Sequence, residues 1–371
     1  MKIMIFETVI SGHVLEWIHH IYEYASKEKN EYVFVLPPTF KDEQSRLTWS
    51  HANNIEFAYL SDIEVVKCTK GGLLKTAYEA SRIIQNYVKL FRADELFLIF
   101  LMKTIPFLPF FLPSNVKVSG VLYRIYLYDS TKAGFRLFLE KIRYWILAKS
   151  KTIKNVFVLN DENVPSKFNH KYRTNKFIYL PDPLPQIDGP FYDLRNELGI
   201  PSLNKIFFQF GTIDKRKNSL TILEACLLMS EEECSDKTLI FSGRFDPTIK
   251  DEFCRLVSLL RNKMQVIILE GFISYQQLNN LCFTTDYIMT LYDNVCQSSG
   301  TIGYSAFFGK CVIGPSNGLL GDLIIKNKLG VVINQITPET VKQVMLSPIE
   351  KQQTTYISSH SVDDFCKVLF K

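Results

Sequence analysis

Apolar runs of strand length recur along the whole chain, and this alternation constrains the fold more than any other feature of the sequence. The segments between the runs carry helical periodicity; in 14–25, for example, Leu15, Ile18 and Tyr22 fall on one helix face. Strand, helix, strand repetition predicts parallel sheets with helices on their faces. The predicted strands are Lys2–Phe6, Tyr32–Leu36, Ile55–Leu60, Leu96–Phe100, Val116–Ile125, Val156–Leu159, Phe177–Leu180, Ile206–Phe210, Thr238–Phe241, Val266–Leu269, Tyr287–Leu291, Cys311–Ile313 and Val331–Ile333.

The alternation pauses once, at Pro181, Pro183 and Pro185, which remove backbone donors and force an extended path. A chain of 371 residues is long enough for two domains. We therefore predict an α/β protein with two doubly wound, Rossmann-like domains, 1–183 and 184–371, and a ligand site in the cleft between them. We also expect the last helix, Val362–Phe370, to pack back on the first domain.

The composition excludes several classes of protein. With 47% hydrophobic and 22% charged residues, the chain buries a large core and is neither disordered nor fibrous. Its 8 cysteines form no CxxC pair, which favours reduced thiols and a cytoplasmic location. The first apolar run is too short for a signal peptide. Lys103 and three prolines interrupt the membrane-like stretch Leu96–Pro113, which is predicted to be a buried strand followed by a helix.

The formal net charge of +5 comes from the first half of the chain. Between Lys132 and Lys154 there are seven basic residues and one acid, Glu140. Apolar residues recur there at helical spacing: Phe135, Phe138, Leu139, Ile142, Trp145 and Ile146. This amphipathic basic helix predicts peripheral contact with anionic lipid headgroups on the inner face of the cell membrane; the alternative is a surface helix with a solvated basic side. No recognition motif accompanies the charge, so nucleic acid is not an expected partner.

One loop combines a glycine with clustered positive charge. The strand Ile206–Phe210 runs into Gly211, Thr212 and then Lys215, Arg216 and Lys217, before a helix near Ser219. Positive side chains and outward backbone amides at the end of a strand favour binding of a diphosphate. The alternative is a solvated charged turn.

A second loop follows the strand Tyr287–Leu291. Its small residues Ser298, Ser299, Gly300 and Thr301 are typical of a helix start, where free amides attract an anion. We interpret it as a second phosphate-binding segment; the alternative is that Ser and Thr only cap the helix.

With these loops in order, the chain resembles nucleotide-sugar-dependent glycosyltransferases of the GT-B fold, especially their large retaining family. The resemblance covers nearly the whole chain, and its best parts are Phe210–Asn218, Leu239–Arg244, Glu270–Leu278 and Gly300–Ile313. It implies a donor-binding C-terminal domain and an acceptor-binding N-terminal domain. The D-x-D metal signature of the other large glycosyltransferase fold is absent from the sequence, and we expect no metal and no cofactor besides the donor substrate.

The resemblance also implies roles for donor-site residues. Lys217 matches the lysine that grips the donor diphosphate in this family, while Thr212 stands where an arginine is expected, so Arg216 or Arg244 takes its part. The diphosphate set is completed by Gly211, Ser298, Ser299, Gly300 and Thr301. The segment Gly271, Phe272, Ile273 resembles the part that holds the base; ordinary core packing is the alternative for the last two.

The family's two glutamates, one near the transferred sugar and one on the ribose, are replaced in this chain. Registering Gly309 with the family's glycine puts Cys296 and Tyr304 at those positions. A shift of one residue brings Gln297 to the first position, where an amide bonds sugar hydroxyls without supplying charge. Gln297 is therefore a predicted catalytic residue, and Tyr304 a predicted ribose contact.

In the N-terminal domain, Ser11, Gly12 and His13 resemble the small-residue loop that approaches donor and acceptor in the family. Tyr123 and Arg124 stand where many members carry a cleft histidine. His13 and Arg124 join the predicted catalytic residues, and Ser11, Gly12 and Tyr123 the predicted acceptor pocket. The alternative for His13 is a structural histidine at a helix start.

The resulting hypothesis is a retaining, metal-independent hexosyltransferase. It moves a sugar from a nucleotide diphosphate sugar to a glycan or lipid-linked acceptor in bacterial cell-surface polysaccharide synthesis. The missing glutamates keep open a non-catalytic protein of the same fold that binds sugar nucleotides or glycans. A nucleotide-sugar epimerase is a further alternative, although few carboxylates are predicted in the cleft.

Overall fold

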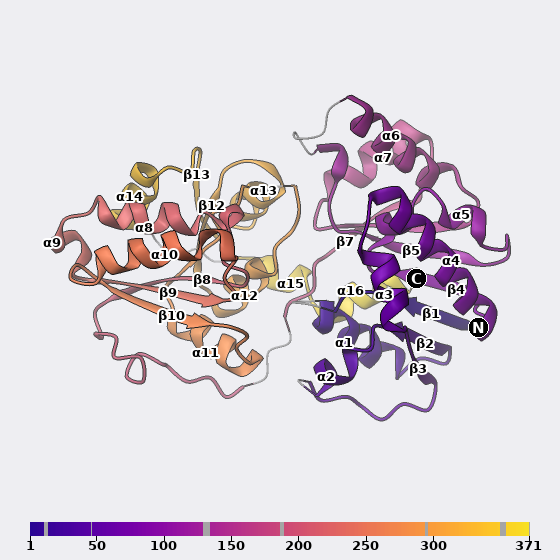
Figure 1. The fold of residues 1–371 in the computed structure, drawn as a ribbon, viewed down its shortest axis with the longest axis horizontal. Coiled ribbons are helices and arrows are strands. Elements are labelled where there is room, and N and C mark those ends of the chain that lie inside the picture. Colours follow the sequence, from indigo (N-terminus) through magenta and orange to yellow (C-terminus); the bar gives the residue numbers. More distant parts are fainter. Residues whose placement is uncertain are drawn as a thin grey trace. The chain divides into compact units, whose positions relative to one another are not determined.

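The computed structural model describes residues 1–371 except 11–13, 46, 129–133, 186–188, 294–295, 349–353 and 371. The chain divides into two compact units (Figure 1). Unit 1 consists of Met1–Pro183 together with Ser361–Lys371, and unit 2 of Leu184–His360. The chain first crosses from unit 1 into unit 2 between Pro183 and Leu184, within the proline-rich stretch 181–185.

Unit 1 contains a parallel sheet in the order β3-β2-β1-β4-β5-β6-β7. Alternate side chains of its strands face opposite layers. Met4 and Phe6 of β1 enter a core that also receives residues of the helices α4, α6 and α7, whereas Phe34 of β2 faces Tyr22 of α1 at 6.0 Å between ring centroids. The strands are β1 (Lys2–Phe6), β2 (Glu31–Leu36), β3 (Ile55–Tyr59), β4 (Glu95–Leu98), β5 (Lys117–Leu122), β6 (Ile153–Leu159) and β7 (Phe177–Leu180).

The helices of unit 1 lie on both faces of this sheet. They are α1 (Val14–Ala25), α2 (Phe40–Gln44), α3 (Asp62–Thr69), α4 (Leu73–Phe91), α5 (Leu108–Phe111), α6 (Gly134–Lys149), α7 (Asn163–Tyr172) and α16 (Val362–Leu369), with 3-10 turns η1 (Leu101–Thr104) and η2 (Tyr126–Tyr128). The helix α16 packs against α1, where the rings of Phe365 and Trp17 are 5.3 Å apart. Phe370, just after α16, stacks on Tyr24 at 5.4 Å.

Unit 2 contains a second parallel sheet, in the order β10-β9-β8-β11-β12-β13. Its strands are β8 (Lys205–Phe210), β9 (Lys237–Gly243), β10 (Gln265–Glu270), β11 (Tyr287–Met289), β12 (Cys311–Pro315) and β13 (Gly330–Ile333). Its helical elements are η3 (Lys215–Lys217), α8 (Ser219–Leu227), α9 (Glu231–Cys234), α10 (Pro247–Leu260), α11 (Tyr275–Thr284), α12 (Gly300–Phe308), α13 (Gly318–Lys326), α14 (Pro338–Leu346) and α15 (Tyr356–Ser359).

The predicted fold class is confirmed: both sheets are parallel and doubly wound, and every predicted strand overlaps a strand of the structure. The main differences are in length. The predicted strand Val116–Ile125 is shorter, because the chain leaves the sheet after Leu122 and turns into η2. The stretch Leu96–Pro113 forms β4, η1 and α5, and within the described part of the chain no helix is long and apolar enough to cross a membrane.

Candidate functional site

The switch point of the unit 2 sheet lies between β8 and β11. These neighbouring strands lead to elements on opposite sides, and ligands of such sheets bind outside the carboxyl ends of the strands at this point. Hydrogen bonds join the loop that follows β8 to the loop that follows β11. The Asn218 amide donates to the carbonyl of Leu291 at 2.9 Å and to a carboxylate oxygen of Asp293 at 2.7 Å. The Asp293 amide donates to the carbonyl of Arg216 at 2.9 Å.

Three adjacent strands of unit 2 end in a glycine with positive φ: Gly211 after β8 (92°), Gly243 at the end of β9 (142°) and Gly271 after β10 (104°). The Gly271 amide donates to the carbonyl of Gly243 at 2.9 Å. A Cβ atom on Gly243 would lie 1.8 Å from the carbonyl oxygen of Gly211. The loops after β8 and β9 therefore approach each other at a distance that only glycine allows.

Lys217 is fixed within the loop after β8. Only 5% of the residue is exposed, its ammonium donates to the carbonyl of Phe210, and it lies 5.3 Å from the ring centroid of Tyr292. The buried side chain of Gln209 in β8 donates to the Lys217 carbonyl at 2.9 Å and accepts from the Ser219 hydroxyl at 2.5 Å. These bonds set the position of Lys217 before any ligand binds.

Arg216 shares the aromatic partner of Lys217. Its guanidinium carbon lies 5.3 Å from the ring centroid of Tyr292, and one of its nitrogens lies 3.4 Å from a carboxylate oxygen of Asp214. With 37% of its side chain exposed, Arg216 reaches solvent while Lys217 does not. Tyr292 thus carries two cations over its ring, an arrangement that the sequence analysis did not predict.

Thr212 belongs to the loop after β8, and Arg244 follows the neighbouring strand β9. Thr212 is exposed, and the exposed Arg244 accepts a backbone hydrogen bond from Ile213 at 2.8 Å. The backbone of Arg244 is thereby joined to the loop after β8. Among the described residues, no contact of its exposed side chain fixes it at the predicted diphosphate site.

The N-terminus of α12 is the second predicted phosphate-binding segment. Ser299 makes no side-chain hydrogen bond to the first amides of α12; its hydroxyl instead lies 2.8 Å from that of Thr301. Ser298 is fully buried, and Gln297 is half-buried. Ser299 therefore does not cap the helix through its side chain, which was the alternative function for this residue.

Packing joins α12 to the end of β8. Tyr304, one turn into α12, lies edge-on to Phe210 at 5.5 Å between centroids and is only 5% exposed. It belongs to an apolar cluster that also includes Ile288 of β11. This cluster joins α12 to the end of β8 through the packed ring of Tyr304, and the ribose contact of Tyr304 stays a prediction.

The two predicted base-binding residues that follow Gly271 differ in exposure. Phe272 is 51% exposed next to Gly271, whereas Ile273 packs against the apolar cluster of Tyr304. Phe272 is thus accessible at the carboxyl edge of the sheet. Ile273 has the core position that was its alternative.

In unit 1, the predicted residues Ser11, Gly12 and His13 lie outside the described residues. Tyr123 and Arg124 directly follow β5. The Tyr123 ring packs edge-on against Trp17 at 6.3 Å and against Phe100 at 5.7 Å, which fixes it at the carboxyl end of the sheet. Arg124 is half-buried, with its guanidinium carbon 5.6 Å from the ring centroid of Tyr126.

Glu7 is a residue that the sequence analysis missed. It follows β1 at the switch point of the unit 1 sheet and is 3% exposed. One carboxylate oxygen accepts from the amides of Thr8 at 2.7 Å and Val9 at 3.0 Å and lies 3.6 Å from the Lys103 ammonium. Burial raises the pKa of Glu7 above its ordinary value, against the opposing effect of Lys103. The only signal in the sequence was a charged residue ending an apolar strand.

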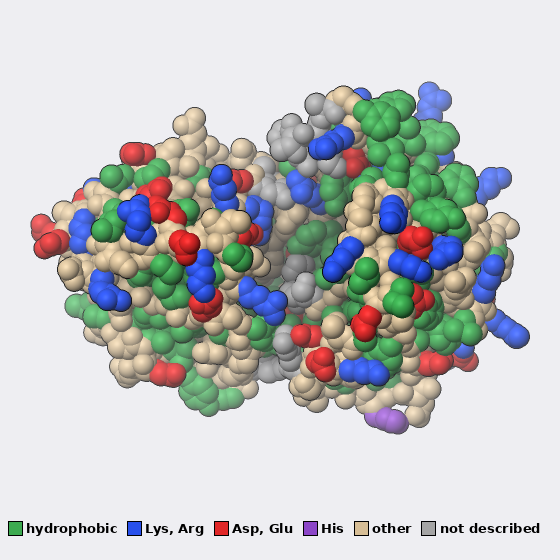
Figure 2. Space-filling model, in the orientation of Figure 1, with side chains coloured by type: hydrophobic (Ala, Val, Ile, Leu, Met, Phe, Trp, Pro, Cys, Tyr) green, Lys and Arg blue, Asp and Glu red, His purple; other side chains and the backbone are tan. Residues whose placement is uncertain are grey.

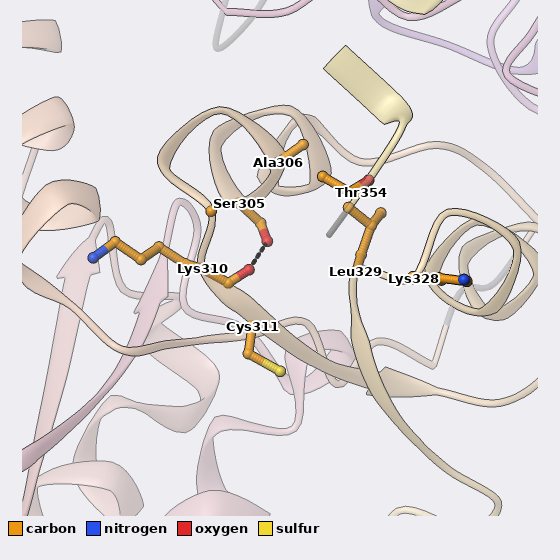
Figure 3. A pocket seen from close by; sticks show the side chains of 8 residues that line it. Ser305, Ala306, Lys310, Cys311, Lys328, Leu329 and Thr354 are labelled. Carbon is orange, nitrogen blue, oxygen red and sulfur yellow. Dashed lines mark hydrogen bonds between the residues drawn. The ribbon is translucent and has the colours of Figure 1, made fainter. Parts of the chain in front are cut away.

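A small pocket elsewhere in unit 2 is not part of this site (Figure 3). It lies between the C-terminal end of α12 and the beginnings of β12 and β13, where the Ser305 hydroxyl donates to the Lys310 carbonyl at 2.5 Å. That is the amino edge of the sheet, opposite to the Lys217 loop. Among the described residues, no group of three or more His, Cys, Asp or Glu side chains is placed to hold a metal ion.

No protein-family model matches the chain, and no curated protein matches its sequence. Solved structures do match it. WaaG, a glycosyltransferase involved in lipopolysaccharide biosynthesis, is 14% identical, with a TM-score of 0.66 over 100% of this chain and 95% of WaaG. Anabaena HepE in complex with UDP and glucose is 15% identical, with a TM-score of 0.65 over 100% of this chain and 96% of HepE. A putative UDP-N-acetylglucosamine 2-epimerase from Listeria monocytogenes is 10% identical, with a TM-score of 0.62 over 99% and 90%.

The chain has the GT-B fold. The resemblance to GT-B glycosyltransferases in the sequence is therefore confirmed at the level of the fold. In this GT-B chain, the structure brings together Gly211, Arg216 and Lys217 at the end of β8, where Tyr304 of α12 packs on Phe210, and it adds Tyr292, Gln209 and Gly243 to them.

Proposed function

We propose that this protein is a glycosyltransferase that moves a sugar from a nucleotide diphosphate sugar to a glycan or lipid-linked acceptor. The observation that carries the proposal is Lys217, held by Gln209 and Tyr292 at the switch point of the unit 2 sheet. Buried, preorganised positive charge at this place suits a diphosphate leaving group. Unit 2 would bind the donor, and unit 1 the acceptor.

The solved structures with the same fold support a sugar nucleotide as the donor. HepE was solved in complex with UDP and glucose and also with UDP-glucose, and WaaG is a glycosyltransferase of lipopolysaccharide biosynthesis. We therefore place UDP-sugars first among the donors to test. We further propose a role in bacterial cell-surface polysaccharide synthesis, in the cytoplasm and peripheral to the membrane.

In the proposed reaction, the bond between the anomeric carbon and the diphosphate oxygen breaks while an acceptor hydroxyl forms the new glycosidic bond and gives its proton to the departing diphosphate. Negative charge grows on the departing diphosphate. Lys217, Arg216 and the first amides of α12 would stabilise that charge without a metal. We propose that the amide of Gln297 bonds hydroxyls of the transferred sugar and that a hexose is transferred with retention of its anomeric configuration.

A non-catalytic protein that binds sugar nucleotides is the second candidate. It is favoured by Cys296 and Tyr304 at the positions of the two family glutamates, because neither side chain supplies a carboxylate. The buried position of Tyr304 strengthens this alternative.

Thermal unfolding with UDP, GDP, CDP, CMP and ADP, each with magnesium or with EDTA, tests the donor site. A ligand of the native state raises the melting temperature by mass action. We expect one nucleoside diphosphate, UDP first, to stabilise the protein equally in both conditions. Failure of all five nucleotides with folded protein would reject the donor site.

Turnover separates the two candidates. Incubation with UDP-glucose and measurement of released UDP detects both transfer and slow hydrolysis of the donor. A protein that is stabilised by UDP yet releases none from a panel of UDP-sugars and acceptors would be a binding protein.

A further inference from the structure

The helix α6 exposes an apolar stripe in unit 1. Its buried side packs on the core through Tyr144, Leu147 and neighbouring residues. The opposite side carries four exposed apolar residues at spacings of three and four, which is one face of a helix. They are Phe135 (75% exposed), Phe138 (57%), Ile142 (36%) and Trp145 (56%).

A water-facing helix side normally carries polar residues, so a continuous stripe of this kind marks a binding surface. Three of its four members are aromatic, and Figure 2 shows hydrophobic side chains gathered over α6 with Lys and Arg side chains nearby. We call the four residues the α6 stripe. It differs from the scattered exposed apolar residues that any soluble protein has.

Within the described residues of α6 and the turn after it, the exposed charges have a single sign. The one acid of the helix, Glu140, is 3% exposed and accepts two hydrogen bonds from Arg143, at 2.9 and 3.0 Å. Arg143 also donates to the carbonyls of Met102 and Ile105, so this ion pair is sealed in the core. The exposed charged residues of α6 and of the turn after it are all basic: Arg136, Lys141, Lys149 and Lys151.

The burial of the Glu140–Arg143 ion pair changes the surface charge that the sequence alone indicates for α6. Counted along the chain, Glu140 offsets one basic residue; in the structure, it neutralises Arg143 in the interior and leaves the outer side of α6 without an exposed carboxylate. Aromatic rings that sit at the level of lipid headgroups, flanked by Lys and Arg, match an anionic bilayer surface. A protein partner would match the stripe but does not by itself explain the one-sign charge.

We propose that unit 1 docks on an anionic membrane surface through α6. Phe135, Phe138 and Trp145 enter the headgroup region, while Arg136, Lys141 and Lys149 contact lipid phosphates. Docking concerns α6 alone and is separate from the donor site. Its benefit to a lipid-linked acceptor rests on the proposed function.

The test is flotation of the full chain with two kinds of vesicle: phosphatidylcholine alone, and an equal mixture of phosphatidylcholine and phosphatidylglycerol. We expect the protein to float with the mixed vesicles only, and to be released as salt is raised, because salt screens the attraction to the charged headgroups. No flotation with mixed vesicles at low salt would overturn the proposal.

Variants identify the surface. Phe138→Glu with Trp145→Glu should lower the vesicle-bound fraction about tenfold, since two charges replace the inserted rings. The matched control is Leu90→Glu with Leu203→Glu, two exposed leucines (70% and 88%) outside α6, which should float like the unchanged protein. Equal flotation of the two double variants would also overturn the proposal.

Two further measurements keep the outcomes distinct. Light scattering without vesicles tests self-association; a dimer that Phe138→Glu with Trp145→Glu dissociates would assign the α6 stripe to a second copy of the chain instead. The shift in melting temperature with UDP, measured on the same variants, should be unchanged. If UDP does not shift the melting temperature of the protein without substitutions, that result would count against the proposed function and not against docking.

Discussion

The loop after β1 in unit 1 and the loop after β8 in unit 2 leave equivalent strands of similarly wound sheets, but they differ in charge. The first begins with Glu7, whose carboxylate takes up the amides of Thr8 and Val9. The second begins with Gly211 and carries Lys217 and Arg216. The two parallel sheets thus provide equivalent locations, and the residues at the strand ends make one of them acidic and the other basic.

The two loops also differ in the contacts that hold them in place. In unit 2, the close approach of Gly243 to Gly211 and the hydrogen bond from the buried Gln209 hold the cationic loop in place. In unit 1, the buried carboxylate of Glu7 accepts hydrogen bonds from the amides of Thr8 and Val9. The following predictions, from the largest expected effect to the smallest, test this asymmetry.

Replacing Lys217 should have the largest effect. Lys217→Ala removes a charged donor from the proposed diphosphate site and should weaken UDP binding about 100-fold, measured by calorimetric titration. Lys215→Ala is the matched control, because Lys215 is exposed in the same turn. Equal affinity of both variants would show that the cationic loop does not bind the nucleotide.

The close contact between loops predicts a large effect on stability. Gly243→Ala puts a Cβ 1.8 Å from the Gly211 carbonyl oxygen and should lower the free energy of unfolding by about 2 kcal/mol. Gly271→Ala has a similar backbone conformation with no heavy atom within 4 Å, so it should lose only about 1 kcal/mol. Chemical denaturation measures both, and equal losses would remove the steric explanation.

The buried glutamine should have a smaller effect. Gln209→Leu leaves the Lys217 carbonyl and the Ser219 hydroxyl without this partner and should destabilise unit 2 by about 1 to 2 kcal/mol, with weaker UDP binding. Ser219→Ala removes only the hydroxyl and keeps the bond to Lys217. Its UDP affinity should therefore stay near that of the unchanged protein; a matching loss would deny Gln209 a positioning role.

Glu7 should have the smallest effect, visible as a pH dependence. Its pKa is raised in the folded protein by burial, so the native state holds the proton more tightly than the unfolded chain. Stability should fall as the pH rises from the ordinary Glu value through the raised pKa. Glu7→Gln should lack this part of the decline, and parallel stability curves of the two proteins across that range would contradict the prediction.

The fold was predictable from the sequence because its signals are local. Each strand is a short apolar run with its own turn residues, and glycine and lysines after β8 mark their loop without reference to the rest of the chain. The site residues that were missed depend on contacts across strands. Nothing near Tyr292 in the sequence indicates two cations over its ring, and Gln209 looks like any residue of a buried strand.

Tyr304 shows that counting positions in the sequence does not give the direction of a side chain. Its predicted ribose contact came from counting positions back from Gly309, which ignores the direction that the side chain takes from α12. In the structure, the ring packs on Phe210, since that side of the helix covers the apolar cluster, and the ribose contact stays a prediction. The roles of Lys217, Arg216, Gln297 and the other predicted site residues remain predictions.

Unit 1 is assembled from two distant stretches of the chain, and this affects the order in which the protein folds during synthesis. Phe365 covers Trp17, and Phe370 contacts Tyr24 and the Phe97 ring at 6.2 Å. These partners are synthesised before unit 2, whereas 361–370 follow only after the whole of unit 2. Until then, the aromatic face around Trp17 is open to water and to chaperones, so unit 2 can reach its native state before unit 1 is complete.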